Sequence, residues 1–197
     1  MEVITKTYHA PDLNVREALR YAGCACENPE MLDLLRSCAE EAEPLLIYKI
    51  CYCLLDSKIR GDICDFGHFS VHSQKLAKNL SGCGKVLLFS ATVGTALDRL
   101  IAKHTRLLPS RAVMLQALGS ERVESLCDMF CSDFEIENNV TLKPRFSPGY
   151  GDLALSVQQN IFSVLNCPKN IGICLNDSFL MSPSKSVTAF AGIGGSI

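Results

Sequence analysis

The stretch that decides the fold class is Lys85-Val-Leu-Leu-Phe-Ser-Ala-Thr-Val-Gly94. Residues 85–90 form a short, continuous apolar run, which is typical of a strand buried on both faces. Residues 90–94 are small and lead directly into a helical pattern over 94–103. A buried strand that runs into a helix predicts a fold that mixes α and β structure.

The segments on either side of this stretch alternate between extended and helical patterns. Strands are predicted over 3–8, 45–55, 171–175, 179–181 and 186–190, and short strands with turns over 59–71. Helices are predicted over 14–21, 29–43, 74–80, 110–131 and 153–165. Asp12 or Asn14 supplies the cap of the first helix, and Asn28 the cap of the second. The glycine-rich end, 192–197, is expected to be frayed.

We therefore expect an α+β fold, with a mixed or antiparallel sheet flanked by helices. No internal repeat or linker divides the 197 residues, so a single domain over 1–197 is predicted. The formal net charge of −2 and the pI near 6.1 argue against nucleic-acid binding. No signal-peptide pattern and no run of about 20 apolar residues occurs, so a cytoplasmic protein without a membrane partner is expected.

Eleven cysteines need an explanation. Their spacings include Cys24-x-Cys26, Cys51-x-Cys53 and Cys127-x-x-x-Cys131, and no CxxC pair occurs. These spacings fit no common zinc or iron–sulfur pattern, which favours small buried hydrophobic side chains in a reducing compartment. The four histidines are expected to be ordinary surface or packing residues. No metal site is predicted.

Two segments contain residues that could bind a ligand. Residues 90–94 could leave backbone N–H groups free for an anion where the strand meets the helix, although a plain turn explains them as well. The sharper segment is Arg145-Phe-Ser-Pro-Gly-Tyr-Gly-Asp152. In it, Pro148 fixes the backbone, Gly149 allows a close approach, and Arg145 provides a planar fork for a carboxylate or phosphate. Tyr150 offers an aromatic face, and Asp152 is expected to cap the next helix.

A second motif follows at a suitable separation: Leu175-x-x-Ser178-x-x-Met181-x-Pro183-x-x-Ser186-Val187. Together the two motifs resemble the activation domain of cobalamin-dependent methionine synthase, in its short free-standing form. The paired motifs span Arg145 to Phe190, and residues 90–94 are similar to a strand–helix junction of that family.

The resemblance implies binding of S-adenosylmethionine. Arg145 matches the family's arginine that binds the methionyl carboxylate through two N–H groups. Tyr150 matches the tyrosine beside the ligand. Pro148 and Gly149 match the turn that allows main-chain contact with the ligand. An upstream helical glutamate faces the ligand's ammonium group in the family. Glu124 is the better match and Glu121 its rival.

The implied function is an accessory domain that supports reductive remethylation of a separate cobalamin-dependent methionine synthase or other corrinoid methyltransferase. Cobalamin would be held by that partner, a flavodoxin-like protein could donate the electron, and no catalytic residue is assigned to this chain. Whether the chain is itself an enzyme is left open; if it is active, it would be as a component of that methyltransferase.

The sequence departs from the family after Val187, where an aromatic-rich stretch is replaced by glycine-rich residues, and it has no tryptophan. This departure favours the alternative, a non-catalytic interaction module of the same fold that has lost its ligand. A redox or metal protein that uses the cysteines is a third hypothesis.

Overall fold

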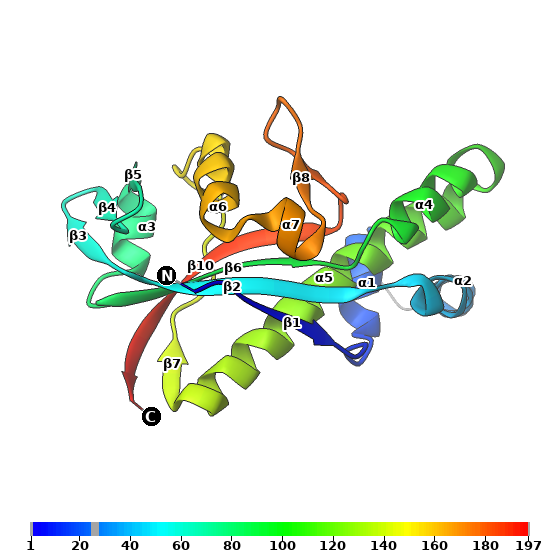
Figure 1. The fold of residues 1–197 in the computed structure, drawn as a ribbon. Coiled ribbons are helices and arrows are strands. Elements are labelled where there is room, and N and C mark those ends of the chain that lie inside the picture. The colour runs from blue at the N-terminus through cyan, green and yellow to red at the C-terminus, as the bar shows by residue number, and fades with distance from the viewer. Residues whose placement is uncertain (1, 25–27, 197) are drawn as a thin grey trace.

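The computed structural model describes residues 2–24 and 28–196 as a central sheet with helices packed on both faces (Figure 1). The strands are β1 (Ile4–Tyr8), β2 (Tyr48–Asp56), β3 (Lys58–Arg60), β4 (Ile63–Asp65), β5 (Ser70–His72), β6 (Lys85–Thr92), β7 (Val140–Leu142), β8 (Cys174–Leu175), β9 (Met181–Ser182) and β10 (Ser186–Ser196). The helices are α1 (Val15–Tyr21), α2 (Pro29–Ala42), α3 (Gln74–Asn79), α4 (Ala96–Leu107), α5 (Pro109–Asn138), α6 (Gln158–Leu165) and α7 (Cys167–Ile171). Short 3₁₀ turns occupy Glu43–Leu45 and Leu155–Val157.

A 5-stranded sheet has the order β1-β2-β6-β10-β7, and every neighbouring pair in it is antiparallel. The strand predicted from the apolar run, β6, lies at the centre of this sheet. The predicted α+β class with a sheet flanked by helices is confirmed.

The central strand contributes alternate side chains to two separate cores. Leu87 and Phe89 pack into a core with α1, α2, α4 and α5 on one face of the sheet. Val86 and Leu88 pack into a second core with α3, α6 and α7 on the other face. Because both faces are covered, β6 is apolar at successive positions instead of alternating with polar residues.

The first two predicted helix starts agree with the observed caps. Asn14 Oδ1 accepts from the N–H of Glu17, and Asn28 Oδ1 from that of Glu30. The helix predicted over 110–131 is longer, because α5 continues to Asn138 and ends where Asn139 adopts a left-handed conformation with φ 52°. In the part of the chain that the structure describes, no helix is long and apolar enough to cross a bilayer.

The prediction of a frayed glycine-rich end is wrong for residues 192–196, which continue β10. Ile197 lies outside the described residues. The glycines make room for neighbours here: a Cβ on Gly192 would lie 2.7 Å from Cys83 Sγ, and the Gly192 carbonyl accepts from Lys143 N–H at 2.8 Å. Glycine at this position therefore allows β10 to pack closely against its neighbours.

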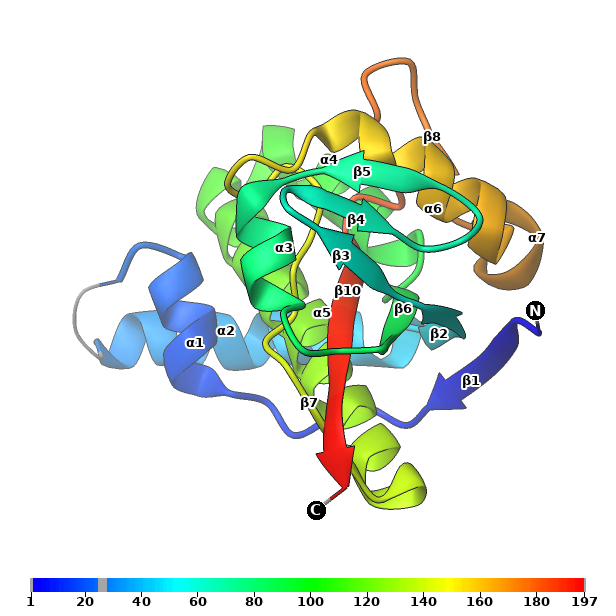
Figure 2. The same cartoon turned by 90° about the vertical axis from the view of Figure 1, so that its left-hand side faces the viewer.

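Several other boundaries differ from prediction. The strand expected over 45–55 starts only at Tyr48, after a 3₁₀ turn. The strand expected over 171–175 is reduced to β8, because α7 extends through Ile171. The expected loop 141–150 begins within the short strand β7. The short strands predicted over 59–71 are confirmed as β3, β4 and β5, which lie beside α3 (Figure 2).

Candidate functional site

The loop after β7 is held in a tight, defined shape. Phe146 exchanges backbone hydrogen bonds of 2.9 Å with Phe190 of β10, which anchors the start of the loop to the sheet. Gly149 has φ 86°, a conformation that a side chain would disfavour. Its N–H donates to the Leu153 carbonyl at 2.8 Å. Tyr150 is 67% exposed at the tip and packs edge-on against the Phe146 ring.

Asp152 does not cap the helix that follows it, so that prediction is wrong. Its carboxylate instead accepts from Ser73 Oγ at 2.5 Å and from Gln74 N–H at 2.8 Å, at the start of α3. The Ser73 hydroxyl and the α3 N–H groups hold the pKa of Asp152 below its usual value. This carboxylate therefore ties the loop to a helix distant in sequence.

Arg145 joins the loop to α5. Its Nη2 donates to Glu124 Oε2 at 3.0 Å and to Asp128 Oδ1 at 2.7 Å. The arginine side chain is only 24% exposed, whereas Asp128 is 72% exposed. Nη1 is buried and has no hydrogen-bond partner among the described residues. A guanidinium with one buried, unsatisfied nitrogen can donate a hydrogen bond to a further acceptor group.

Two cavities meet at this ion pair. One, of about 230 Å³, is lined by Glu124, Arg145, Ser147, Tyr150 and Val187. The other, of about 190 Å³, lies toward α1 and is lined by Asn14, Glu17, Tyr21, Glu121, Glu124, Ser125, Asp128 and Arg145. Arg145 and Glu124 border both cavities, so a cation and a carboxylate are presented side by side. Pro148 is buried and Gly149 exposed, and neither lines these cavities.

The two candidate glutamates have different environments. Glu121 is 1% exposed and is paired with the equally buried Arg122 at 2.6 Å. Glu121 Oε1 also accepts from Asn14 N–H at 3.0 Å. Glu124 is 41% exposed and faces the cavities. Only Glu124 combines exposure with contact to Arg145.

The second motif lies next to the first. Val187 on β10 lines the 230 Å³ cavity. Ser184 Oγ donates to Asp98 of α4 at 2.5 Å, and Lys185 Nζ donates to Ser120 of α5 at 3.0 Å. Gly119 permits this approach, since a Cβ there would lie 2.9 Å from the Lys185 side chain. The segment is thereby fixed over α4 and α5, beside the arginine loop.

At the junction 90–94, the backbone N–H groups of Val93 and Gly94 are used within the fold and are not free for an anion. Val93 N–H donates to the Lys185 carbonyl at 3.2 Å, and Gly94 N–H to Thr92 Oγ1 at 3.1 Å. The alternative interpretation, a plain strand-to-helix turn, fits these contacts.

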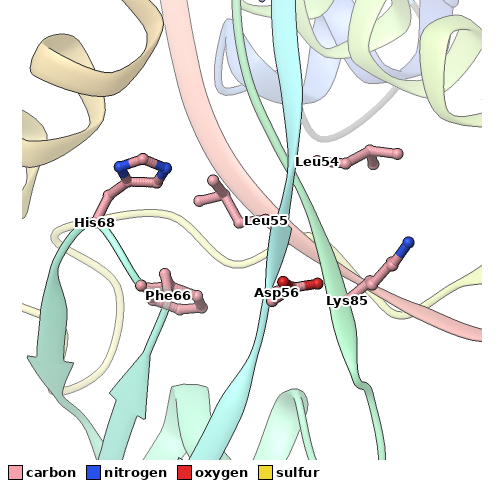
Figure 3. A pocket seen from close by; sticks show the side chains of 7 residues that line it. Leu54, Leu55, Asp56, Phe66, His68 and Lys85 are labelled. Atoms are coloured by element: carbon pink, nitrogen blue, oxygen red, sulfur yellow. The ribbon is translucent and has the colours of Figure 1, made fainter. Parts of the chain in front are cut away.

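A separate cavity of about 400 Å³ opens at the far end of β2 and β6. Figure 3 shows Leu55 and Leu54 on opposite sides of β2, with His68 and Phe66 on the Leu55 side and Asp56 and Lys85 nearer the Leu54 side. It shares no lining residue with the two cavities at Arg145.

Most cysteines lie in the cores. Hydrogen bonding to Cys167 and burial raise the pKa of the Cys51 thiol, and burial raises that of Cys53 to about 11. Thiols with raised pKa values are poor nucleophiles and poor metal ligands. Within residues 2–24 and 28–196, no group of three His, Cys, Asp or Glu side chains is arranged to hold a metal ion. Cys26 lies outside the described residues.

Sequence reasoning missed Asp128 and Tyr21. The signal for Asp128 was its position four residues after Glu124, which places both carboxylates on one helix face. Tyr21 comes from α1 and is brought to the site by tertiary packing alone.

Comparison with solved structures gives a match that covers almost the whole chain. No protein-family model and no curated protein matches the sequence. Among solved structures, the MetH reactivation domain bound to AdoHcy matches with a TM-score of 0.70 and 15% sequence identity. The match covers 98% of this chain and 78% of that chain. The chain therefore has the fold of the MetH reactivation domain.

Proposed function

We propose that the chain binds S-adenosylmethionine at the Arg145–Glu124 site and supports reductive remethylation of a cobalamin-dependent methionine synthase or related corrinoid methyltransferase. The observation that carries this proposal is the adjacent guanidinium and carboxylate on the rim of the 230 Å³ cavity, beside an exposed tyrosine. The shared fold with a domain that binds AdoHcy supports it.

The residues present fit an amino-acid head group. The buried, unsatisfied Nη1 of Arg145 can donate to a ligand carboxylate, and Glu124 can accept from the neighbouring ammonium. The exposed ring of Tyr150 offers a face for stacking or for a sulfonium cation. When bound, the ligand supplies a methyl group activated by its positive sulfur. The role of this chain is to hold that group in a fixed orientation toward the corrinoid partner.

Replacing Arg145 by alanine is expected to weaken S-adenosylmethionine binding about 10- to 100-fold, because a charge-assisted hydrogen bond contributes roughly 1.5–3 kcal/mol. Isothermal titration calorimetry of the purified chain measures this directly. Arg36→Ala is the control, since Arg36 lies on α2, is 71% exposed and pairs only with Asp33, at 3.6 Å, among the described residues.

Equal affinities of wild type and Arg145→Ala for S-adenosylmethionine would contradict the assignment of Arg145 to the ligand site. If wild type shows no binding at millimolar ligand, the alternative of a non-catalytic interaction module is favoured. A pull-down with a corrinoid methyltransferase then tests the partner without relying on the ligand.

A further inference from the structure

Asp128 has no role in the proposed function, yet its carboxylate contacts the Arg145 guanidinium that would hold the ligand's carboxylate. We propose that Asp128 is a built-in competitor for Arg145, which imitates a ligand carboxylate and lowers the affinity for ligands with an amino-acid head group. This inference rests on the proposed function and concerns the control of the same site.

The geometry supports competition. The Asp128 carboxylate lies 2.7 Å from Arg145 Nη2, closer than Glu124 at 3.0 Å. Asp128 is 72% exposed and lines the 190 Å³ cavity, which shares Arg145 and Glu124 with the 230 Å³ cavity. The contact to Arg145 is the one hydrogen bond that its side chain makes within the described residues. Turning the Asp128 side chain toward solvent therefore breaks no other side-chain hydrogen bond within the described residues.

The balance of charge indicates which carboxylate must leave. One guanidinium already faces two carboxylates, and an amino-acid ligand adds a third. The ligand's ammonium compensates Glu124, but nothing in the ligand's head group compensates Asp128. Like charges around one partly buried cation repel each other, so ligand binding favours displacement of Asp128.

Replacing Asp128 by asparagine preserves the size of the side chain and removes its charge. We expect the variant to bind S-adenosylhomocysteine about two- to fivefold more tightly, the range typical of an exposed ion pair. S-adenosylhomocysteine is chosen because it carries no net charge, so removing a negative charge does not weaken its general attraction to the site. Its decarboxylated counterpart keeps the ammonium but lacks the competing group, and its binding should not tighten.

The experiment is calorimetry with both compounds on wild type, Asp128→Asn and Asp33→Asn. Asp33 is the matched control, an aspartate on α2 that is 77% exposed and has an arginine partner of its own. Tighter binding of S-adenosylhomocysteine by Asp128→Asn alone supports the inference, including the case in which only this variant binds detectably.

Two results would overturn it while leaving the proposed function in place: wild-type binding that Asp128→Asn does not strengthen, or equal strengthening for both compounds. If neither wild type nor Asp128→Asn binds S-adenosylhomocysteine or S-adenosylmethionine, the proposed function itself fails and the inference fails with it.

Discussion

Glu121→Gln is expected to lower the free energy of unfolding by about 3–5 kcal/mol, because it leaves a buried arginine without its counter-charge. Arg122 is 2% exposed and its Nε donates to Glu121 at 2.6 Å. The remaining guanidinium nitrogens donate to the carbonyls of Pro11 at 2.7 Å and Asp12 at 2.9 Å. Two neutral carbonyls cannot balance a desolvated positive charge. Chemical denaturation of the purified variant measures the loss.

The double variant Glu121→Gln/Arg122→Met provides the decisive comparison. The double variant also removes the buried positive charge of Arg122, so no charge is left without a partner. It should therefore be more stable than Glu121→Gln alone. A double variant less stable than the single one would show that the pair stabilises by packing and not by charge compensation. Glu124→Gln, at a half-exposed position, should keep wild-type stability to within about 0.5 kcal/mol and affect ligand affinity instead.

Phe130→Ala should also destabilise the fold by about 3–5 kcal/mol, the cost of a large cavity in a packed core. Phe130 is fully buried on α5, with its ring 5.1 Å from those of Phe89 and Tyr52. It therefore packs the long helix α5 against β2 and β6. The change is measured as a lower midpoint of thermal or denaturant unfolding.

Ile136→Ala is the control for this substitution. Ile136 lies on the same helix but is 77% exposed, so its truncation should change stability by no more than about 0.5 kcal/mol. Similar losses for both variants would contradict the prediction, because they would show that burial in the aromatic core does not set the cost of truncating a side chain on α5.

The sequence was sufficient to predict the features that depend on local pattern. The apolar run at 85–90 predicted the central strand, and Asn14 and Asn28 predicted helix starts, because burial and capping leave clear signals in neighbouring residues. Features that depend on distant contacts were missed. Gly192 suggested a frayed end, since its role as space for Cys83 is visible only after folding.

The same distinction applies to the candidate site. The loop that carries Arg145 could be found from its motif. The sequence left Glu124 and Glu121 as alternatives for the glutamate of the site, and the structure puts Glu124 beside Arg145. Asp152 looked like a local cap but serves α3, because a carboxylate binds whichever helix start the fold brings to it. The four-residue spacing from Glu124 places Asp128 on the same helix face, but only the folded structure shows that both carboxylates contact Arg145.

The buried Glu121–Arg122 pair and its hydrogen bonds to residues 11–14 affect which fragments of the protein can be studied. Arg122 ties Pro11 and Asp12 to α5, and Glu121 ties Asn14 to it. Asn14 and the helix that it caps, α1, supply Asn14, Glu17 and Tyr21 to one cavity wall. Any shortened version that lacks the first 22 residues would lose this wall and expose the charged pair to water. Binding studies on such a fragment would therefore understate what the full chain can do, even if the Arg145 loop remained intact.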